Sequence, residues 1–296
     1  MRKPWTPGRD RRAVRHPAAA GALRLPPGES ASVLVLGGGI AGLAAAAALA
    51  ERGVAVTLVE KHDQLGGRVR AWPVQHDDGS SRVTMSRGFH AFFRQYYNLR
   101  GLLRRVDPLL QSLTAVPDYP LVLAGGHTDS FATIPRTPPL NMAAFVARSP
   151  SFSLSDLAAV DVASAFELLD VEFPATFAAY DGESASDFLD RLHFPSGARH
   201  LALEVFARSF FAQPTEFSAG ELVAMFHTYF LGSSEGLLFD VPVDDYDTVL
   251  WAPLGRYLTG LGVQVLTGRS VDRLTVDAAD SGAPVQVVLD DGEVLT

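Results

Sequence analysis

The sequence predicts an α/β fold built around an open parallel β-sheet, and three features near its start lead to this prediction. An apolar run, Ser32–Leu36, has the composition of a buried parallel strand. An alanine-rich segment, Leu43–Arg52, has high helix propensity and is followed by Gly53, a residue suited to end a helix. A second β-branched run, Val54–Val59, completes the strand–helix–strand order of a βαβ unit.

The turn between the first strand and the helix fits the pattern G-x-G-x-x-G, with glycines at positions 37, 39 and 42. Gly37 permits the tight turn, and Gly39 lets the backbone come close to a pyrophosphate. Gly42 lets the helix pack closely on the strand. This pattern predicts a Rossmann-like dinucleotide-binding domain.

Two further features of the βαβ unit support a bound dinucleotide. The N-terminus of the predicted helix would present free N–H groups and a positive dipole end to a diphosphate, and Ile40 and Ala41, just before the helix, are predicted to bind the cofactor. Glu60 ends the second strand, 60 − 42 = 18 residues after the third glycine, close to the roughly 20 expected for the acid that binds a ribose hydroxyl. A carboxylate at this position repels a 2′-phosphate, so NADP is disfavoured.

FAD and NAD share this fingerprint, and the segment after Glu60 distinguishes them. The sequence KHDQLGGR, Lys61–Arg68, resembles the E-x4-GG-R continuation of the FAD-dependent amine oxidase and phytoene desaturase superfamily, although five residues separate Glu60 from Gly66 here. The resemblance implies FAD, with Lys61, Gly66 and Gly67 close to the cofactor and Arg68 at its diphosphate. A guanidinium offers a fork of donors matched to phosphate oxygens. A solvated surface arginine is the alternative for Arg68.

A second segment narrows the resemblance. Gly88, Phe89 and His90 look like the glycine–histidine loop that lies beside the flavin ring in carotenoid desaturases. The wider run Ser86–Pro108 resembles the actinobacterial β-carotene desaturase/methylases, also called isorenieratene synthases. This resemblance implies ring desaturation of β-carotene, an apolar polyene, with a methyl shift and with hydride transfer to FAD. A histidine between aromatic residues is equally compatible with a buried core position, and the sequence assigns no catalytic base.

Two alternatives to carotenoid desaturation stay open. One is another flavin-dependent oxidoreductase of the amine oxidase type, and the other is an inactive remnant. The end of the chain bears on the second. The resemblance places Val271 at the backbone position that pairs with adenine, and Val285–Asp290 and Glu293–Leu295 are predicted strands of a β-ribbon. Because the family continues beyond such a ribbon, we expect a C-terminally truncated domain that retains FAD weakly and is inactive alone.

The predicted domains follow from these segments. Residues 1–30 form a basic disordered tail, residues 31–92 and 250–296 form an incomplete FAD-binding domain, and residues 93–249 form an inserted α+β substrate-binding domain. In the inserted domain, Asp118–Ile134 predicts a hairpin, and helical patterns cover residues 155–169, 184–192, 196–211 and 218–231. Ser218 and Glu221 fit a capping box at the last of these.

Composition limits the remaining function classes. The chain has no cysteine, which excludes disulfides and thiolate chemistry, and its eight histidines form no metal-binding pattern, so we expect no metal. Residues 1–30 carry seven Lys/Arg and two acids, a charge of +5, which leaves −8 − 5 = −13 on the rest and argues against nucleic-acid binding. We expect a cytoplasmic protein whose basic tail attracts it to the inner membrane face, with a solvated tail as the alternative. The oligomeric state is open.

Overall fold

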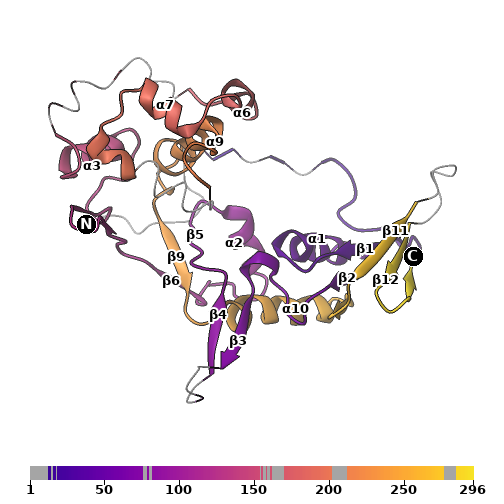
Figure 1. Cartoon of the computed structure of the whole chain (residues 1–296). Coiled ribbons are helices and arrows are strands. Elements are labelled where there is room, and N and C mark those ends of the chain that lie inside the picture. The colour runs from indigo at the N-terminus through magenta and orange to yellow at the C-terminus, as the bar shows by residue number, and fades with distance from the viewer. Residues whose placement is uncertain are drawn as a thin grey trace. The chain divides into compact units, whose positions relative to one another are not determined.

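A computed structural model of the chain divides into two compact units (Figure 1). It describes residues 13, 14, 16, 17, 19–75, 79, 82–153, 155, 158, 161, 170–201, 212–276 and 285–296. The glycine-loop unit comprises His16–Phe92, Tyr96–Thr114 and Asp240–Thr296. The aromatic unit comprises Phe93–Gln95 and Ala115–Phe239.

This division differs from the expected substrate-binding range 93–249. Residues 96–114 and 240–249 were expected in that range, whereas they belong to the glycine-loop unit. The reason is packing, because Leu102, Leu103 and Leu110 join the same core as the βαβ unit. Residues 1–12, 15 and 18 of the predicted basic tail lie outside the described residues.

The glycine-loop unit is built on a parallel sheet of three strands, in the order β1-β2-β10. These strands are β1 (Ser32–Leu36), β2 (Ala55–Glu60) and β10 (Gln264–Thr267), with Val33 opposite Val56 and Val265 opposite Leu58. The helix α1 (Ile40–Ala50) connects the first two strands and lies beside them (Figure 1). The predicted α/β fold with a parallel sheet is therefore confirmed.

The helix α1 begins three residues earlier than the sequence predicted. Gly39 occupies the N-cap position, so the helix starts at Ile40 and includes Gly42 in its first turn. Gly53, with a φ of +86°, follows the helix, as the sequence indicated. Leu43, Ala46 and Ala47 on the helix are fully buried. Small alanine side chains thus let α1 lie close against the sheet.

The second half of the core in this unit comes from segments distant in sequence. A π-helical turn, η5 (Asp247–Trp251), runs directly into α10 (Ala252–Gly260), and α2 (Tyr97–Leu103) packs with the same cluster. Trp251, Leu254 and Leu258 are at most 1% exposed. Burial of each such side chain contributes about 1.5–3 kcal/mol. The core therefore fixes η5 and α10 against α1 and β2.

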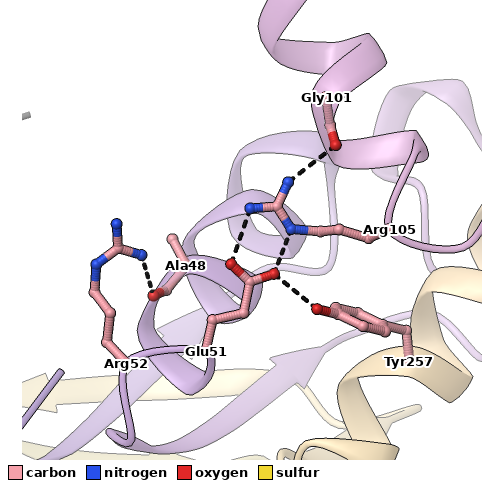
Figure 2. A network of polar contacts seen from close by, with 6 residues as sticks. All are labelled: Ala48, Glu51, Arg52, Gly101, Arg105 and Tyr257. Atoms are coloured by element: carbon pink, nitrogen blue, oxygen red, sulfur yellow. Dashed lines mark hydrogen bonds and ion pairs between the residues drawn. The ribbon is translucent and has the colours of Figure 1, made fainter. Parts of the chain in front are cut away.

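A polar network in the glycine-loop unit links the C-terminus of α1 to the segment after α2 and to α10 (Figure 2). The Glu51 carboxylate, at the C-terminus of α1, accepts bonds from the guanidinium of Arg105 and, at 2.8 Å, from the hydroxyl of Tyr257 on α10. Arg105 also donates to the carbonyl of Gly101 at 3.0 Å. The hydrogen bond from Arg105 is the largest influence on the pKa of Glu51, which lies below its ordinary value.

Two antiparallel ribbons complete the glycine-loop unit. Strands β11 (Val271–Thr275), β12 (Gln286–Leu289) and β13 (Val294–Leu295) form the ribbon that the sequence predicted, and Val287 and Leu289 bury their side chains against Val59 of β2. The short helix η1 (Gly67–Val69) leads into a hairpin of β3 (Ala71–Gln75) and β4 (Arg82–Ser86), drawn in purple in Figure 1.

The aromatic unit contains short helices and a hairpin. The hairpin of β7 (Leu121–Val122) and β8 (Thr128–Asp129) turns at Gly125, which has a φ of +70°, as predicted. The described helices are α3 (Leu140–Arg148), α6 (Ala175–Tyr180), α7 (Ala185–Arg191), η3 (Ser196–Ala198), α9 (Ala219–Phe226) and the π-helical η4 (His227–Leu231). Strands β5 (Phe92–Phe93), β9 (Phe239–Pro242) and β6 (Leu113–Ala115) form a further sheet in that order, and most of its residues are assigned to the glycine-loop unit.

Helix caps in the aromatic unit match the sequence only in part. Ser184 caps α7 and accepts a bond from Asp187 N at 3.1 Å. Ser218 caps α9, but its hydroxyl accepts from Gly220 N at 3.1 Å rather than from the Glu221 amide that a capping box requires. Most of the predicted helices 155–169 and 196–211 lie outside the described residues.

Candidate cofactor site

The glycine turn, residues 37–42, is closed by backbone contacts that leave no room for a side chain at Gly42. Gly37 has a φ of +104° and donates to the Val59 carbonyl at 2.7 Å, so the turn is bonded to the end of β2. A Cβ atom on Gly42 would overlap the carbonyl oxygen of Gly37. The turn therefore requires glycine at both positions. The first N–H groups of α1, at Ile40, Ala41 and Gly42, have no partner within the helix.

Glu60 is a buried carboxylate that organises the turn. Its side chain is on a residue only 5% exposed. Oε2 accepts from Gly38 N at 2.7 Å, and Oε1 accepts from His62 N at 2.9 Å. The sequence predicted a ribose ligand here, and a carboxylate with about four acceptor sites can bind a hydroxyl in addition to two amides. The ribose contact stays a prediction, whereas the role in the loop is an added finding.

The paired glycines lie against the glycine turn, backbone to backbone. Gly66 donates to the Gly38 carbonyl at 2.8 Å. A Cβ on Gly67 would come within 2.9 Å of Gly39 Cα, and a Cβ on Gly38 would come within 2.6 Å of Leu65 Cδ2. The two loops that the sequence assigned to one cofactor therefore meet in space, and the glycines leave room for their close approach.

Two cationic side chains lie on the second loop. Arg68 is in the middle of η1 and is exposed, and Lys61 is exposed at the end of β2. Within the described part of the chain, Arg68 forms no ion pair. Its guanidinium is therefore available to an anionic group at the loop.

The short segment between β10 and β11 lies beside Glu60. Gly268 N donates to the His62 carbonyl at 3.0 Å, and Arg269 N donates to the Glu60 carbonyl at 3.1 Å. These bonds place the chain leading to Val271 next to the acid at the end of β2. Val271 itself is opposite Leu289 in the ribbon. The proximity of this segment to Glu60 is consistent with the adenine contact of Val271, which stays a prediction.

The loop Gly88–His90 is held by a tyrosine from a distant segment. His90 N donates to the hydroxyl of Tyr246 at 3.3 Å, and the two rings meet edge to face with centroids 5.8 Å apart. Gly88 has a φ of +124°, and Phe89 is 70% exposed. His90 is thus half-buried beside an aromatic ring, and Phe89 faces solvent.

Sequence reasoning missed two residues of this region, Tyr246 and Trp251. The indole N–H of Trp251 donates to the Val69 carbonyl at 2.6 Å, next to Arg68. A Cβ on Gly66 would lie 2.5 Å from Trp251 Nε1, so the ring fills the space beneath that glycine. In the sequence, a tryptophan in an apolar run gives no signal beyond burial.

The arrangement fits a dinucleotide with a diphosphate. The free N–H groups of α1 and an exposed guanidinium are suitable donors for phosphate oxygens, and the backbone of Gly39 and Gly67 carries no side chain that would block a cofactor. No group of three His, Cys, Asp or Glu side chains among the described residues could hold a metal ion.

The aromatic unit contains a small cavity of about 90 Å³. The rings of Tyr119 and Phe131 stack in its wall with centroids 5.0 Å apart, and Phe131 stacks in turn on Phe145 at 4.8 Å. Burial raises the pKa of Tyr119. Polar lining comes from Asp118, Arg136, Asn141, Ser233 and Ser234. The cavity can accept an apolar group against the rings.

Fold and site together define a dinucleotide-binding domain in which two glycine-containing loops meet. Residues 40–296 match the family of flavin-containing amine oxidoreductases, and residues 1–74 match the pyridine nucleotide-disulphide oxidoreductases. The chain belongs to the flavin-containing amine oxidoreductase family. The family and the geometry identify FAD as the cofactor, which confirms the prediction.

Two curated relatives share most of the chain. A carotenoid phi-ring synthase of Streptomyces griseus is 60% identical over 260 residues, which is 88% of this chain and 50% of the relative. A carotenoid phi-ring synthase of Chlorobaculum tepidum is 30% identical over 246 residues, 82% of this chain and 38% of the relative. The chain therefore spans half or less of the length of these relatives.

Solved structures share the fold at low sequence identity. Putrescine oxidase bound to putrescine is 17% identical with a TM-score of 0.60, over 90% of this chain and 56% of that one. An oxidoreductase from Methanosarcina mazei is 14% identical with a TM-score of 0.57, over 89% and 56%. These likenesses support the fold alone. No described helix is long and apolar enough to cross a bilayer.

Proposed function

We propose that the protein carrying this chain is an FAD-dependent oxidoreductase that desaturates a carotenoid. The finer proposal is aromatisation of the β-ring of β-carotene with a methyl shift. The observation that carries it is the 60% identity to a carotenoid phi-ring synthase over most of this chain. The two-loop cofactor site, formed by backbone contacts of Gly38 with Gly66 and of Gly39 with Gly67, supports the flavin dependence.

When bound, FAD supplies the acceptor for the hydride that each new ring double bond releases. The residues of this chain bind and orient. The N-terminus of α1 and Arg68 would hold the diphosphate, and Glu60 would accept from the ribose while it keeps the glycine turn closed. The Gly88–His90 loop would lie at the flavin ring, and Val271 would present its backbone to adenine.

The aromatic unit is proposed to hold the polyene. The stacked rings of Tyr119 and Phe131 form the aromatic part of the cavity wall, and Phe145 stacks on Phe131 outside the lining. Ring stacking against a conjugated ligand contributes more than area alone. The cavity of about 90 Å³ is far smaller than a carotenoid, so it would receive one part of the substrate only.

A polyene dissolved in lipid requires access to the bilayer surface. The charge of +5 on residues 1–30 supports attraction to the anionic inner face of the membrane, at about 1 kcal/mol for each Lys or Arg near the surface. A cytoplasmic, peripherally associated enzyme is the proposal. Deletion of residues 1–30 should reduce sedimentation with anionic liposomes, and unaltered sedimentation would reject the tail as the contact.

Amine oxidation is the second candidate, favoured by the family match over residues 40–296. Product analysis separates the two. The intact FAD-loaded protein is incubated with β-carotene in liposomes, and pigments are separated chromatographically. An aromatic-ring carotenoid is the expected product. Consumption of a primary amine with β-carotene unchanged would support the second candidate and reject the first.

A further inference from the structure

The segment Tyr246–Trp251 reaches two loops that are far apart in the sequence. Asp247–Trp251 is a π-helical turn, and Tyr246 is its N-cap residue. Single π-helical turns are rare and recur at functional sites. The two aromatic residues at the ends of the segment each bond to a different loop of the glycine-loop unit.

Trp251 fixes the loop that carries Arg68 from both sides. Its indole N–H donates to the Val69 carbonyl at 2.6 Å, immediately after Arg68. Its ring lies against Gly66, the residue before Gly67. A Cβ atom added to Gly66 would be only 3.0 Å from Cγ of Trp251. Trp251 is fully buried and packs in the core, so its position does not follow loop motion. One rigid ring thus sets the backbone on each side of Gly67 and Arg68.

Tyr246 fixes the loop Gly88–His90. Its hydroxyl accepts from His90 N at 3.3 Å and lies 3.5 Å from the Gly88 carbonyl, a weak contact. Its ring meets His90 edge to face at 5.8 Å and is tilted against Phe92 at 6.2 Å. Phe92 is 4% exposed, so this side of the loop is anchored in the core.

We propose that Tyr246 and Trp251 are positioning residues for FAD, acting as one bracket. Trp251 places Arg68 for the diphosphate, and Tyr246 places the Gly88–His90 loop for the flavin ring. The inference rests on the proposed function for the roles of those two loops. Its physical reason is preorganisation, because a loop already held in its bound form loses less entropy when the cofactor binds.

Trp251→Phe tests the first contact, since it keeps an aromatic ring and removes the indole N–H. The Val69 carbonyl then loses its donor. FAD affinity of the intact protein, measured by flavin fluorescence titration, should fall about tenfold, which corresponds to about 1.4 kcal/mol. Tyr257→Phe is the matched control, because it removes one side-chain hydrogen bond, to Glu51, from the helix that follows. It should leave FAD affinity within about twofold.

Gly66→Ala approaches the same contact from the loop side, and remains informative if Trp251→Phe does not fold. Gly53→Ala is its control, because Gly53 also has a positive φ but its added Cβ meets nothing closer than 4.0 Å. Both variants strain the backbone, and Gly66→Ala alone should push the loop from the Trp251 ring. Its FAD affinity should fall more than that of Gly53→Ala.

Tyr246→Phe tests the second contact. Amide hydrogen exchange at His90 should accelerate, the visible absorption of bound flavin should shift, and FAD affinity should fall, because the released loop loses more entropy on binding. If the amide of His90 exchanges in Tyr246→Phe at the wild-type rate, Tyr246 does not position this loop. Equal FAD affinity of Trp251→Phe and Tyr257→Phe would remove Trp251 from the bracket.

Failure of the bracket and failure of the proposed function give different results. FAD titration needs no carotenoid, so a protein that binds FAD but converts no carotenoid leaves the bracket testable and rejects the function. Trp251→Phe and Gly66→Ala proteins that bind FAD as tightly as their controls overturn the bracket even where β-carotene is converted.

Discussion

Replacing Glu60 by alanine should both destabilise the glycine-loop unit and weaken FAD binding. The carboxylate is the partner of two backbone amides, Gly38 N at 2.7 Å and His62 N at 2.9 Å. Gly38 is buried, so its N–H would be left without a partner and without access to water. His62 is half-buried, and water can replace part of its lost bond.

The magnitude follows from these two bonds. An orphaned buried N–H costs about 2 kcal/mol, and the partly solvated one about 1 kcal/mol, so Glu60→Ala should lower the free energy of unfolding by about 3 kcal/mol. Glu60→Gln keeps the shape and one acceptor but turns an amide NH₂ toward one of the two N–H groups. Its cost should be about 2 kcal/mol. Because a total stability of about 5–15 kcal/mol is typical, both effects are large.

Urea unfolding and FAD titration of the intact protein measure the two consequences. FAD affinity of Glu60→Ala should fall by about a hundredfold, because the glycine turn that binds the cofactor would lose its order. Glu221→Ala, an exposed acid in the first turn of α9, is the control and should change stability by less than about 0.5 kcal/mol. If Glu60→Ala and the Glu221→Ala control have the same free energy of unfolding and the same FAD affinity, the reasoning is refuted.

Three further variants test other parts of the account. Arg68→Ala should weaken FAD binding about tenfold in fluorescence titration, through loss of a phosphate contact, with no change in melting temperature; unchanged affinity would remove Arg68 from the site. The hydrogen bond from Arg105 lowers the pKa of Glu51 below 4.5, so its stabilisation is present above pH 4.5 and is lost as the pH falls through the lowered pKa. Acid unfolding of Glu51→Gln should therefore lack this pH-dependent component, and an identical pH profile would contradict it. Ala132→Trp, which fills the cavity, should reduce carotenoid conversion but not FAD affinity, and full conversion would exclude the cavity as a substrate contact.

The βαβ unit was predictable because its signals are local. Strand β1 has the bounds that the apolar run indicated, Ser32–Leu36, and the glycine spacing located the turn. The start of α1 was less well predicted, since Gly39 caps the helix before the alanine-rich run begins. Helix propensity describes the interior of a helix, whereas its first residue depends on the turn that precedes it.

The site was predictable only in its loops. Spacing and resemblance assigned Glu60 and the Gly66–Arg68 segment to one cofactor, but could not indicate that Glu60 would bond to Gly38, 22 residues away. Trp251 reaches Val69 across 182 residues, and Tyr246 reaches His90 across 156. Such contacts depend on the packed core, for which a single sequence provides no pairing signal. The misplaced range 96–114 has the same origin, since its leucines join a core made by other segments.

Anaerobic reduction of the bound flavin tests the central claim most directly. The intact FAD-loaded protein is mixed without oxygen with β-carotene in liposomes or, separately, with putrescine, and the visible absorbance of oxidised flavin is followed. A carotenoid desaturase should lose this absorbance with β-carotene and retain it with putrescine. Loss of absorbance with the amine, and none with the carotenoid, would contradict that claim.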